Sequence, residues 1–483
     1  MLTNPRNTII PISHLIIDLH GSIHSITISL ISGLILVFSL LNLKLAQNRR
    51  NVKCNNKDNL FVSVDLSPDE ATQLIQKSHH VSLAIDCSGS MYGEALDDAK
   101  NAAIQAVSSL SPNDLVSIVA FETEAKVVLS ATPANDSNIA NVINSLEDGG
   151  GTAMYDGIDI AFDLLQKFIT PNTINKLMVF TDGEPTVGPD DAEIIKKCKE
   201  IRSAGVSVDV FGIGIDYNEN LTKAISEAGG GKWEHIENTK DLQTTVMLQM
   251  TEMQKTIVSN PQLELSLMQG AELAEAAIIT PTYQKIDLND HQMSGNKISF
   301  GIKDIVIDQS QTIAMRISVP SIQTTQPTPL VTARITEASQ EIAVETAQIA
   351  CSDDPEIYNL ETDPDPRVLF QSGKATQLIQ QGIEDGDDQA TKMGKTILSS
   401  LESDASSGDL GDEAQATVIN AQELGGNLKP GMTEAQKKTI MHQSTQIGKK
   451  ADLLCPSCQA IIKPGAKFCG KCGKPINKQE DSQ

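Results

Sequence analysis

The chain has 483 residues, a length that predicts about two to four domains rather than one hydrophobic core. Apolar residues make up 40% of it and aromatic residues only 3%, so we expect its cores to consist of Val, Ile, Leu and Ala. The formal net charge of −24 disfavours general binding to nucleic acid or to anionic membrane surfaces.

The first feature along the chain is a long apolar segment at residues 26–43. As a helix it would span roughly 27 Å, close to the thickness of a bilayer core. Basic residues are more frequent after this segment than before it, namely Lys44, Arg49, Arg50 and Lys53. By the positive-inside rule, we expect a single-pass membrane protein whose bulk faces the cytoplasm, anchored by an N-terminal region of residues 1–58. The alternative is a soluble cytoplasmic protein with an unstructured leader.

The second feature is an alternation of apolar strands with helices over residues 78–258, which predicts an α/β domain with a doubly wound, mainly parallel sheet. The expected strands are 81–86, 114–122, 125–130, 175–183 and 206–215. The expected helices are 93–110, 153–169, 191–205, 218–230 and 240–257.

Beyond this domain the hydrophobic period shifts to two, and short strands are separated by Pro, Gly, Asn and Asp. We expect a small antiparallel β-sandwich over residues 259–352. The alternating stretch 61–67 precedes the α/β domain and is expected to add a strand to this sandwich.

The chain then becomes acidic, with apolar residues at helical spacing and Gly and Asp between the segments. Residues 365–450 are expected to form a small helical bundle.

Oxygen-bearing side chains follow the expected strand 81–86. Asp86, Ser88 and Ser90 stand in the stretch "DCSGS", Thr152 follows three glycines, and Asp182 ends a later strand in "FTDG". Ligands of open parallel sheets bind at the carboxyl ends of the strands, so we expect these five side chains to meet. Two carboxylates and three hydroxyls suit a hard cation, Mg²⁺ or else Mn²⁺ or Ca²⁺, better than zinc or copper. The alternative is a polar turn without a metal.

These three stretches resemble, in order and in residue types, the metal-ion-dependent adhesion site of von Willebrand factor type A domains. The resemblance covers roughly residues 78–258. It implies that Ser88, Ser90 and Thr152 supply hydroxyl ligands, and that Asp86 and Asp182 contact the ion directly or through water. It also implies that a carboxylate from another protein completes the coordination. The type A domain followed by a short sandwich is similar in architecture to bacterial and archaeal proteins grouped with calcium-activated chloride channel regulators and inter-alpha-trypsin inhibitor heavy chains. This likeness does not imply channel activity.

The eight cysteines fall into two groups. Four are scattered singly along the chain, at Cys54, Cys87, Cys198 and Cys351. We expect Cys87 to be a small side chain turned into the core. A secreted disulfide scaffold would be shorter and denser in cysteine. The four cysteines paired near the C-terminus suggest thiolate metal ligands instead, and for that reason we expect a reducing compartment.

The other four cysteines form a C-x2-C-x10-C-x2-C pattern within residues 452–476: Cys455, Cys458, Cys469 and Cys472. Four thiolates at this spacing favour tetrahedral Zn²⁺, and so short a segment needs the metal in order to fold. The pattern resembles the zinc-ribbon family. A disulfide pair or an iron centre is the alternative. Lysines make the ribbon locally basic, which permits nucleic-acid contact, but we expect a structural tail or a protein-docking element.

No His is expected near the three loops, and no phosphate-loop, HExxH or GxSxG motif occurs in the sequence. Glu184 and Asp156 are nearby acids, which we interpret as loop and helix-start polarity rather than as a catalytic base. We therefore expect a non-enzymatic, Mg²⁺-dependent protein-binding module whose unknown partner presents an Asp or Glu. The alternatives are a nucleic-acid-associated scaffold acting through the ribbon and a metal-dependent phosphoesterase.

Overall fold

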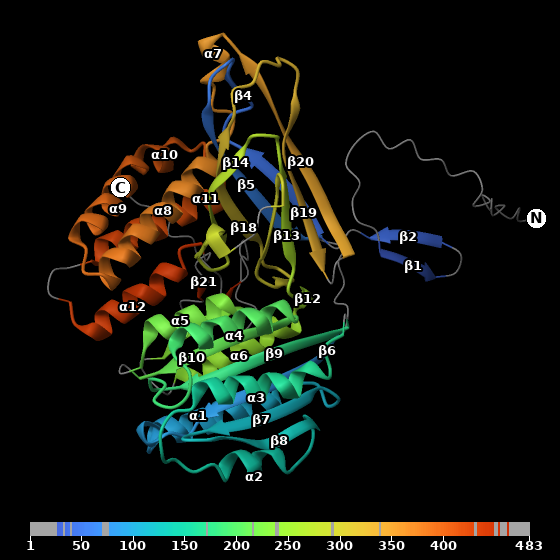
Figure 1. Cartoon of the computed structure of the whole chain (residues 1–483), viewed down its shortest axis with the longest axis vertical. Coiled ribbons are helices and arrows are strands. Elements are labelled where there is room, and N and C mark those ends of the chain that lie inside the picture. The colour runs from blue at the N-terminus through green and yellow to red at the C-terminus, as the bar shows by residue number, and fades with distance from the viewer. Residues whose placement is uncertain are drawn as a thin grey trace, which may run out of the picture.

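A computed structural model describes residues 27–31, 34–38, 41–69, 77–170, 172–214, 217–236, 241–290, 294–337, 340–428, 432–448, 453–454 and 461–462. Figure 1 shows an α/β part at the bottom, β-sheets above it and a group of helices at one side.

The α/β part is built on a six-stranded sheet of order β11-β10-β9-β6-β7-β8. Its strands are β6 (Ser78–Asp86), β7 (Leu115–Phe121), β8 (Ala125–Pro133), β9 (Thr173–Thr181), β10 (Val206–Ile213) and β11 (Gly230–Ile236). Neighbouring strands are parallel except β7 and β8. The central strands are almost wholly buried, as expected for a parallel sheet with both faces covered. Strand β11 is absent from the sequence prediction.

Helices cover both faces of this sheet. They are α1 (Glu94–Ser108), α2 (Ile139–Asn144), α3 (Met154–Gln166), α4 (Asp191–Ser203), α5 (Glu219–Ala228) and α6 (Leu242–Gln254). The helices α1, α2 and α6 share one hydrophobic core with the sheet. The opposite core contains α3, α4 and α5. The prediction of an α/β, doubly wound, mainly parallel sheet is confirmed.

Two five-stranded sheets lie above the α/β part, in the orders β16-β13-β19-β20-β4 and β15-β14-β18-β5-β3. Their strands are β3 (Leu41–Gln47), β4 (Asn51–Lys53), β5 (Asp58–Pro68), β13 (Gln262–Leu267), β14 (Glu272–Thr280), β15 (Gln284–Ile286), β16 (Lys297–Gly301), β18 (Gln311–Val319), β19 (Thr328–Glu337) and β20 (Gln340–Ser352). Buried residues from both sheets form one core. The pair β12 (Thr256–Val258) and β17 (Ile305–Val306) joins these sheets to the end of α6.

The expected membrane helix at residues 26–43 is wrong. The described residues of this segment are strands: β1 (Thr27–Ile31) pairs with β2 (Leu34–Phe38), and β3 begins at Leu41 and pairs with β5. Of the residues that the structure describes, none belongs to a helix that is both long and apolar enough to cross a membrane. The expectation of a single-pass membrane protein is therefore contradicted. Six of the 18 residues in this segment are β-branched, four of them Ile, and β-branched residues favour strands.

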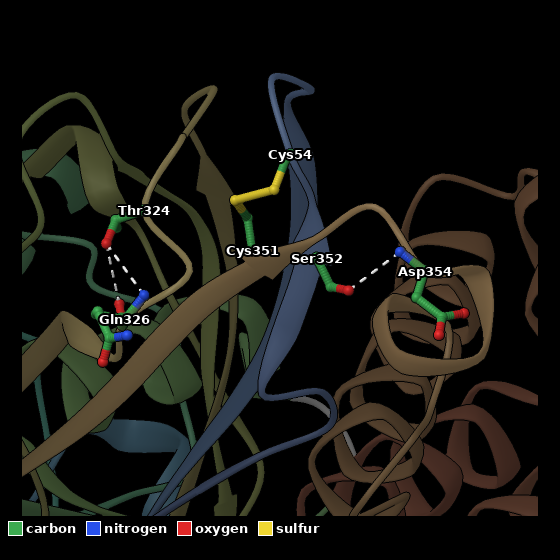
Figure 2. Close-up of a disulfide and its surroundings, with 6 residues drawn as sticks. All are labelled: Cys54, Thr324, Gln326, Cys351, Ser352 and Asp354. Carbon is green, nitrogen blue, oxygen red and sulfur yellow. Dashed lines mark hydrogen bonds between the residues drawn. A yellow bond between two sulfur atoms is a disulfide. The ribbon is translucent and has the colours of Figure 1, made fainter.

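Two of the cysteines expected to stand singly are joined. Cys54 follows β4, Cys351 lies in β20, and their sulfur atoms form a disulfide across a sequence separation of 297 residues (Figure 2). The bond joins the end of β4 to β20, and these two strands pair in parallel at one edge of the sheet. The expectation that Cys54 and Cys351 stand singly is therefore wrong. The bond also disagrees with the reducing compartment inferred from the paired C-terminal cysteines, because disulfides persist in oxidising compartments.

The remaining helices are α7 (Pro355–Tyr358), α8 (Asp365–Glu384), α9 (Asp388–Ser400), α10 (Glu402–Ser407), α11 (Asp412–Asn427) and α12 (Glu434–Thr445). Helix α7 lies against β4 and β20, whereas α8 packs on β5, β14 and β18, and α9, α11 and α12 pack on α8. The core that α8, α9, α11 and α12 share includes Ile279 and Ala314 of the sheet. Helix α12 also reaches the α/β part, where Lys438 Nζ donates a hydrogen bond of 2.8 Å to the carbonyl of Tyr217.

Candidate metal centre

The candidate site lies where the order of the α/β sheet reverses. After β6 the chain adds β7 and β8 on one side of that strand, and it then returns to the other side of β6 to form β9. Such a reversal leaves a crevice at the carboxyl ends of the two central strands, the usual place for a ligand. Asp86 is the last residue of β6, and Thr181 is the last residue of β9. The hydroxyl of Thr181 donates a hydrogen bond of 2.6 Å to Asp86 Oδ2.

The loop after β6 brings three predicted residues together. The backbone N–H of Ser88 donates to Asp86 Oδ1 at 2.9 Å, which fixes the carboxylate from its second oxygen. A short 3₁₀ helix, η2 (Gly89–Met91), then turns the chain, and the fully buried side chain of Met91 anchors it. As a result, the hydroxyls of Ser88 and Ser90 lie 3.0 Å apart. Ser90 Oγ also donates to Asp182 Oδ1 at 2.8 Å.

Thr152 is held beside this loop by backbone hydrogen bonds. Gly149 N donates to the carbonyl of Cys87 at 2.8 Å, and Gly89 N donates to the carbonyl of Gly150 at 3.3 Å. The N–H of Thr152 donates to the hydroxyl of Thr186 at 2.9 Å, so its side chain is free to face the site. Thr152 is buried. The glycines before it allow this close approach of two loops.

Gly183 marks the point on which the donor oxygens converge. A β-carbon at this position would lie 3.3 Å from Ser90 Oγ, 3.6 Å from Thr152 Oγ1 and 4.0 Å from Asp86 Oδ2. Oxygens from the loop after β6 and from the loop that carries Thr152 therefore lie around one position on a third loop, and only Ser90 Oγ is closer to it than an ordinary van der Waals contact. All of them are carboxylate or hydroxyl oxygens, the ligands of Mg²⁺ and Ca²⁺. The residues present fit a small hard cation.

The electrostatics of Asp86 favour the same kind of ligand. Burial raises the pKa of this carboxyl to about 6; hydrogen bonds from Thr181 and Ser88 oppose the rise, and the nearby charge of Asp182 adds to it. Two carboxylates in a poorly solvated site repel each other, and a divalent cation would remove this penalty. The floor of the site is buried, whereas Ser90 is exposed and Asp182 is half-buried, so the site faces solvent.

The structure thus joins four of the five predicted residues in one hydrogen-bonded chain, with Thr152 facing the same point. Sequence reasoning missed Thr181, which holds Asp86, and Gly183, which leaves the space. Both belong to the stretch "FTDG", from which only Asp182 was chosen. The sequence held only a weak signal for either residue: a glycine at a strand end permits close approach, but which groups approach it depends on the pairing of β6 with β9.

The nearest thiol and the nearest histidines along the chain do not offer acid–base chemistry at this point. Burial, together with the charge of Asp86, raises the pKa of the Cys87 thiol to about 12, so this side chain is an inert part of the core. His79 and His80 lie at the other end of β6. His79 Nδ1 pairs with Asp114 Oδ2 at 3.2 Å, and burial lowers the pKa of His80 to about 4.

The four predicted zinc ligands, Cys455, Cys458, Cys469 and Cys472, lie outside the described residues. Near them the structure describes two short paired strands, β21 (Leu453–Leu454) and β22 (Ile461–Ile462).

Comparison with protein families agrees with the expected type A domain and the expected zinc ribbon. Residues 80–251 match the family model of the von Willebrand factor type A domain, and residues 454–476 match that of the zinc-ribbon domain. The chain therefore contains a type A domain, formed by the six-stranded sheet and its helices, and a C-terminal zinc ribbon. Type A domains are in general protein-interaction modules, and neither match indicates a catalytic family.

Among curated relatives, an uncharacterized protein of Synechocystis is 27% identical over 248 residues, which are 49% of this chain and 56% of that protein. The uncharacterized protein YfbK of Escherichia coli is 28% identical over 215 residues, 44% of this chain and 37% of YfbK. Mouse inter-alpha-trypsin inhibitor heavy chain 4 is 26% identical over 174 residues, 34% of this chain and 18% of the inhibitor chain. The matches span between 18% and 56% of the length of these relatives.

Two solved structures share the fold over most of the chain. The von Willebrand factor type A protein from Catenulispora acidiphila aligns with a TM-score of 0.68 at 14% identity, over 89% of this chain and 98% of that one. The ArnB paralog VWA2 from Sulfolobus acidocaldarius aligns with a TM-score of 0.59 at 16% identity, over 85% of this chain and 99% of that one. These likenesses concern the fold alone, and they extend beyond the type A domain.

Proposed function

We propose that this protein is a non-enzymatic binding scaffold whose type A domain docks a protein partner through a bound metal ion. Asp86, Ser88, Ser90, Thr152 and Asp182 hold Mg²⁺, or else Mn²⁺ or Ca²⁺, at the carboxyl end of the sheet. The ion keeps a coordination position toward solvent, and an Asp or Glu of the partner fills it.

The observation that carries this proposal is the convergence of donor oxygens on Gly183. Hydroxyls and one carboxylate oxygen lie within 4.0 Å of the position that a β-carbon would take there. The two carboxylates balance the formal charge of +2 on the ion without exceeding it, so the site carries no excess negative charge that would repel a further carboxylate ligand. The exposure of Ser90 supports access from solvent.

Binding is favoured over catalysis by the surroundings of the five residues. A hydrolase needs a general base or a second metal near the ion. The nearest histidines along the chain lie at the far end of β6, and the thiol of Cys87 is buried. A metal-dependent phosphoesterase remains the weaker alternative, and turnover of phosphoesters that disappears in an Asp182→Ala variant would favour it.

The zinc ribbon is proposed to bind Zn²⁺ through Cys455, Cys458, Cys469 and Cys472 and to serve as a structural or protein-docking tail. A second candidate function, a nucleic-acid-associated scaffold, depends on the lysines of this ribbon. Retention of RNA or DNA at moderate salt that disappears on deletion of residues 452–476 would support that alternative, while absence of any retention removes it.

Metal titration of the full chain tests the main proposal. Calorimetry with Mg²⁺ and Mn²⁺ should give saturable binding that is lost in Asp86→Ala and in Ser90→Ala, and kept in the control Asp353→Ala. Ser90 is exposed, so its variant should fold even if the buried Asp86 proves necessary for folding. Partner capture by the same proteins should require the metal and disappear with a chelator. Equal metal binding by the native chain and both site variants refutes the assignment.

A further inference from the structure

The exposed groups around the candidate metal site are of kinds that attract cations. Met91 is fully buried, but the next residue, Tyr92, has a side chain 79% exposed at the end of η2. Glycine at position 93 has a φ of 87°, which lets the chain turn from this tyrosine into α1. An aromatic ring that faces water next to a metal loop offers a flat surface with a negative face, which attracts cations.

Carboxylates that are not proposed metal ligands lie on two of the three loops that carry those ligands and on the turn after β7. Glu122 follows β7, and a β-carbon at Gly150 would lie 2.7 Å from its Oε2. Asp148 is exposed and directly precedes Gly149, whose N–H donates to the carbonyl of Cys87. Glu184 is exposed and directly follows Gly183. We call Tyr92, Glu122, Asp148 and Glu184 the acidic rim.

The nearby basic side chains do not neutralise this rim. Lys126 Nζ lies 3.4 Å from Glu122 Oε1, in a pair exposed enough to be weak. Lys100 has a largely buried side chain and lies 4.0 Å from Asp97 on the same helix. Neither lysine reaches Asp148 or Glu184 in a described ion pair, so the negative charge of the rim faces solvent.

We infer that the partner of this site is a protein segment in which the metal-binding Asp or Glu is flanked by Lys or Arg. This inference rests on the proposed metal-dependent function. The ion selects a carboxylate, but a carboxylate in an acidic segment would approach Glu122, Asp148 and Glu184 and be repelled. Basic residues beside it pair with these carboxylates, and an Arg or Lys also stacks on the ring of Tyr92.

The expected selectivity follows from the charges. Each solvent-screened pair of opposite charges changes the affinity by about twofold, so three carboxylates change it by about tenfold. Most of the effect should disappear at high salt, because the pairs are exposed.

The probes are two synthetic peptides of equal length with one central Asp in a Gly-Ser background. One carries Lys on both sides of the Asp, and the other carries Glu. Both are immobilised on a biosensor, and the full-length protein is passed over them with Mg²⁺ or with a chelator. The rim variant combines Glu122→Gln, Asp148→Asn and Glu184→Gln. Its control, Asp353→Asn with Glu356→Gln and Asp409→Asn, removes the same charge from exposed positions outside the α/β part.

The expected result is Mg²⁺-dependent binding that is about tenfold tighter for the Lys-flanked peptide. The preference should fall to near unity in the rim variant and persist in the control, and Tyr92→Ala should reduce it in part. Equal Mg²⁺-dependent binding of both peptides overturns the inference and leaves the metal-docking function standing. A preference that survives in the rim variant also overturns it. Absence of Mg²⁺-dependent binding to either peptide overturns the proposed function itself.

Discussion

The hydroxyl of Thr181 donates a hydrogen bond of 2.6 Å to Asp86 Oδ2, and this bond joins the carboxyl ends of the two central strands, β6 and β9. Both groups are fully buried. The bond orients the carboxylate and partly offsets the cost of its burial, so Thr181 positions Asp86 for whatever the site binds.

Replacing Thr181 with Val tests this role. Valine keeps the shape of threonine but leaves a buried carboxylate oxygen without its donor, which should lower the free energy of unfolding by about 1–3 kcal/mol in the absence of metal. It should also weaken the affinity for Mg²⁺, because the pKa of Asp86 rises further when a donor is lost. Chemical denaturation and calorimetry measure the two effects. Thr181→Ser retains the hydroxyl and should stay close to the native protein; similar losses in both variants would mean that packing, not the hydrogen bond, matters.

Gly183 permits a test that leaves every proposed ligand in place. In Gly183→Ala, the added methyl group would lie 3.3 Å from Ser90 Oγ and 3.6 Å from Thr152 Oγ1, inside the space assigned to the ion. We expect the variant to fold and to lose Mg²⁺ affinity by at least about tenfold, since a misplaced ligand set no longer closes on a small ion that demands strict geometry.

The matched control for this substitution is Gly89→Ala in the neighbouring loop. Its β-carbon would meet only the carbonyl oxygen of Gly150, at an ordinary contact distance of 3.6 Å. It should bind Mg²⁺ as the native chain does. Unchanged metal binding in Gly183→Ala would place the ion elsewhere or remove it altogether.

Thr181 and Gly183 show how much of the site could be predicted from the sequence. Asp86, Ser88 and Ser90 could be selected because a polar triplet directly follows an apolar strand, and strand ends collect in one place in a parallel sheet. Thr181 and Gly183 act through a neighbour that lies almost a hundred positions away in the chain. Only the register of β6 against β9 makes them adjacent, and no local pattern encodes that register.

The incorrect predictions about the fold have a similar origin. Residues 26–43 were judged by length and apolar content, which do not distinguish a helix from consecutive strands; the β-branched residues and Gly33 weighed against a helix. Cys54 and Cys351 carry no spacing signal, because their partnership arises from the pairing of β4 with β20. The alternation of strands and helices over residues 78–258 succeeded because each segment was long and strongly periodic.

The stability of the protein should depend on pH through Asp65 of β5. Burial, aided by the charge of Glu413, raises the pKa of Asp65 to about 6 from an ordinary value of 3.8, although Thr312 and Ser63 donate hydrogen bonds to it and Lys44 lies nearby. The folded state therefore binds a proton more tightly than the unfolded state. The stabilisation is complete below about pH 4 and is lost as the pH rises through about 6.

Removing this ionisable group should make the free energy of unfolding less dependent on pH. Because a pKa shift of about two units corresponds to roughly 3 kcal/mol, Asp65→Asn should gain up to about that much relative to the native chain between pH 4 and 7. Urea denaturation at several pH values measures the difference between the two proteins, which cancels the contribution of Asp86. The exposed control Asp353→Asn should follow the native curve. If the free energy of unfolding of Asp65→Asn changed with pH in parallel with that of the native chain, the pKa of Asp65 would not be raised in the folded protein.

The disulfide between Cys54 and Cys351 should contribute strongly to the stability of the two β-sheets. It closes a loop of 297 residues that contains the whole type A domain, so it restricts the unfolded chain over a long span. Replacing both cysteines with Ser should lower the free energy of unfolding by about 2–5 kcal/mol. The Mg²⁺ affinity of the type A domain should change little, because its own cores are separate.

Reductant provides the internal control for this prediction. Treatment with dithiothreitol should destabilise the native chain and have little further effect on the double variant, apart from any effect on zinc that the two proteins share. Peptide mapping under non-reducing conditions should recover Cys54 linked to Cys351. Two free thiols at these positions in protein purified under oxidising conditions would contradict the bond. The buried Cys87 and Cys198 should stay unmodified in both proteins, because burial raises the pKa of each thiol to about 12 and keeps it protonated.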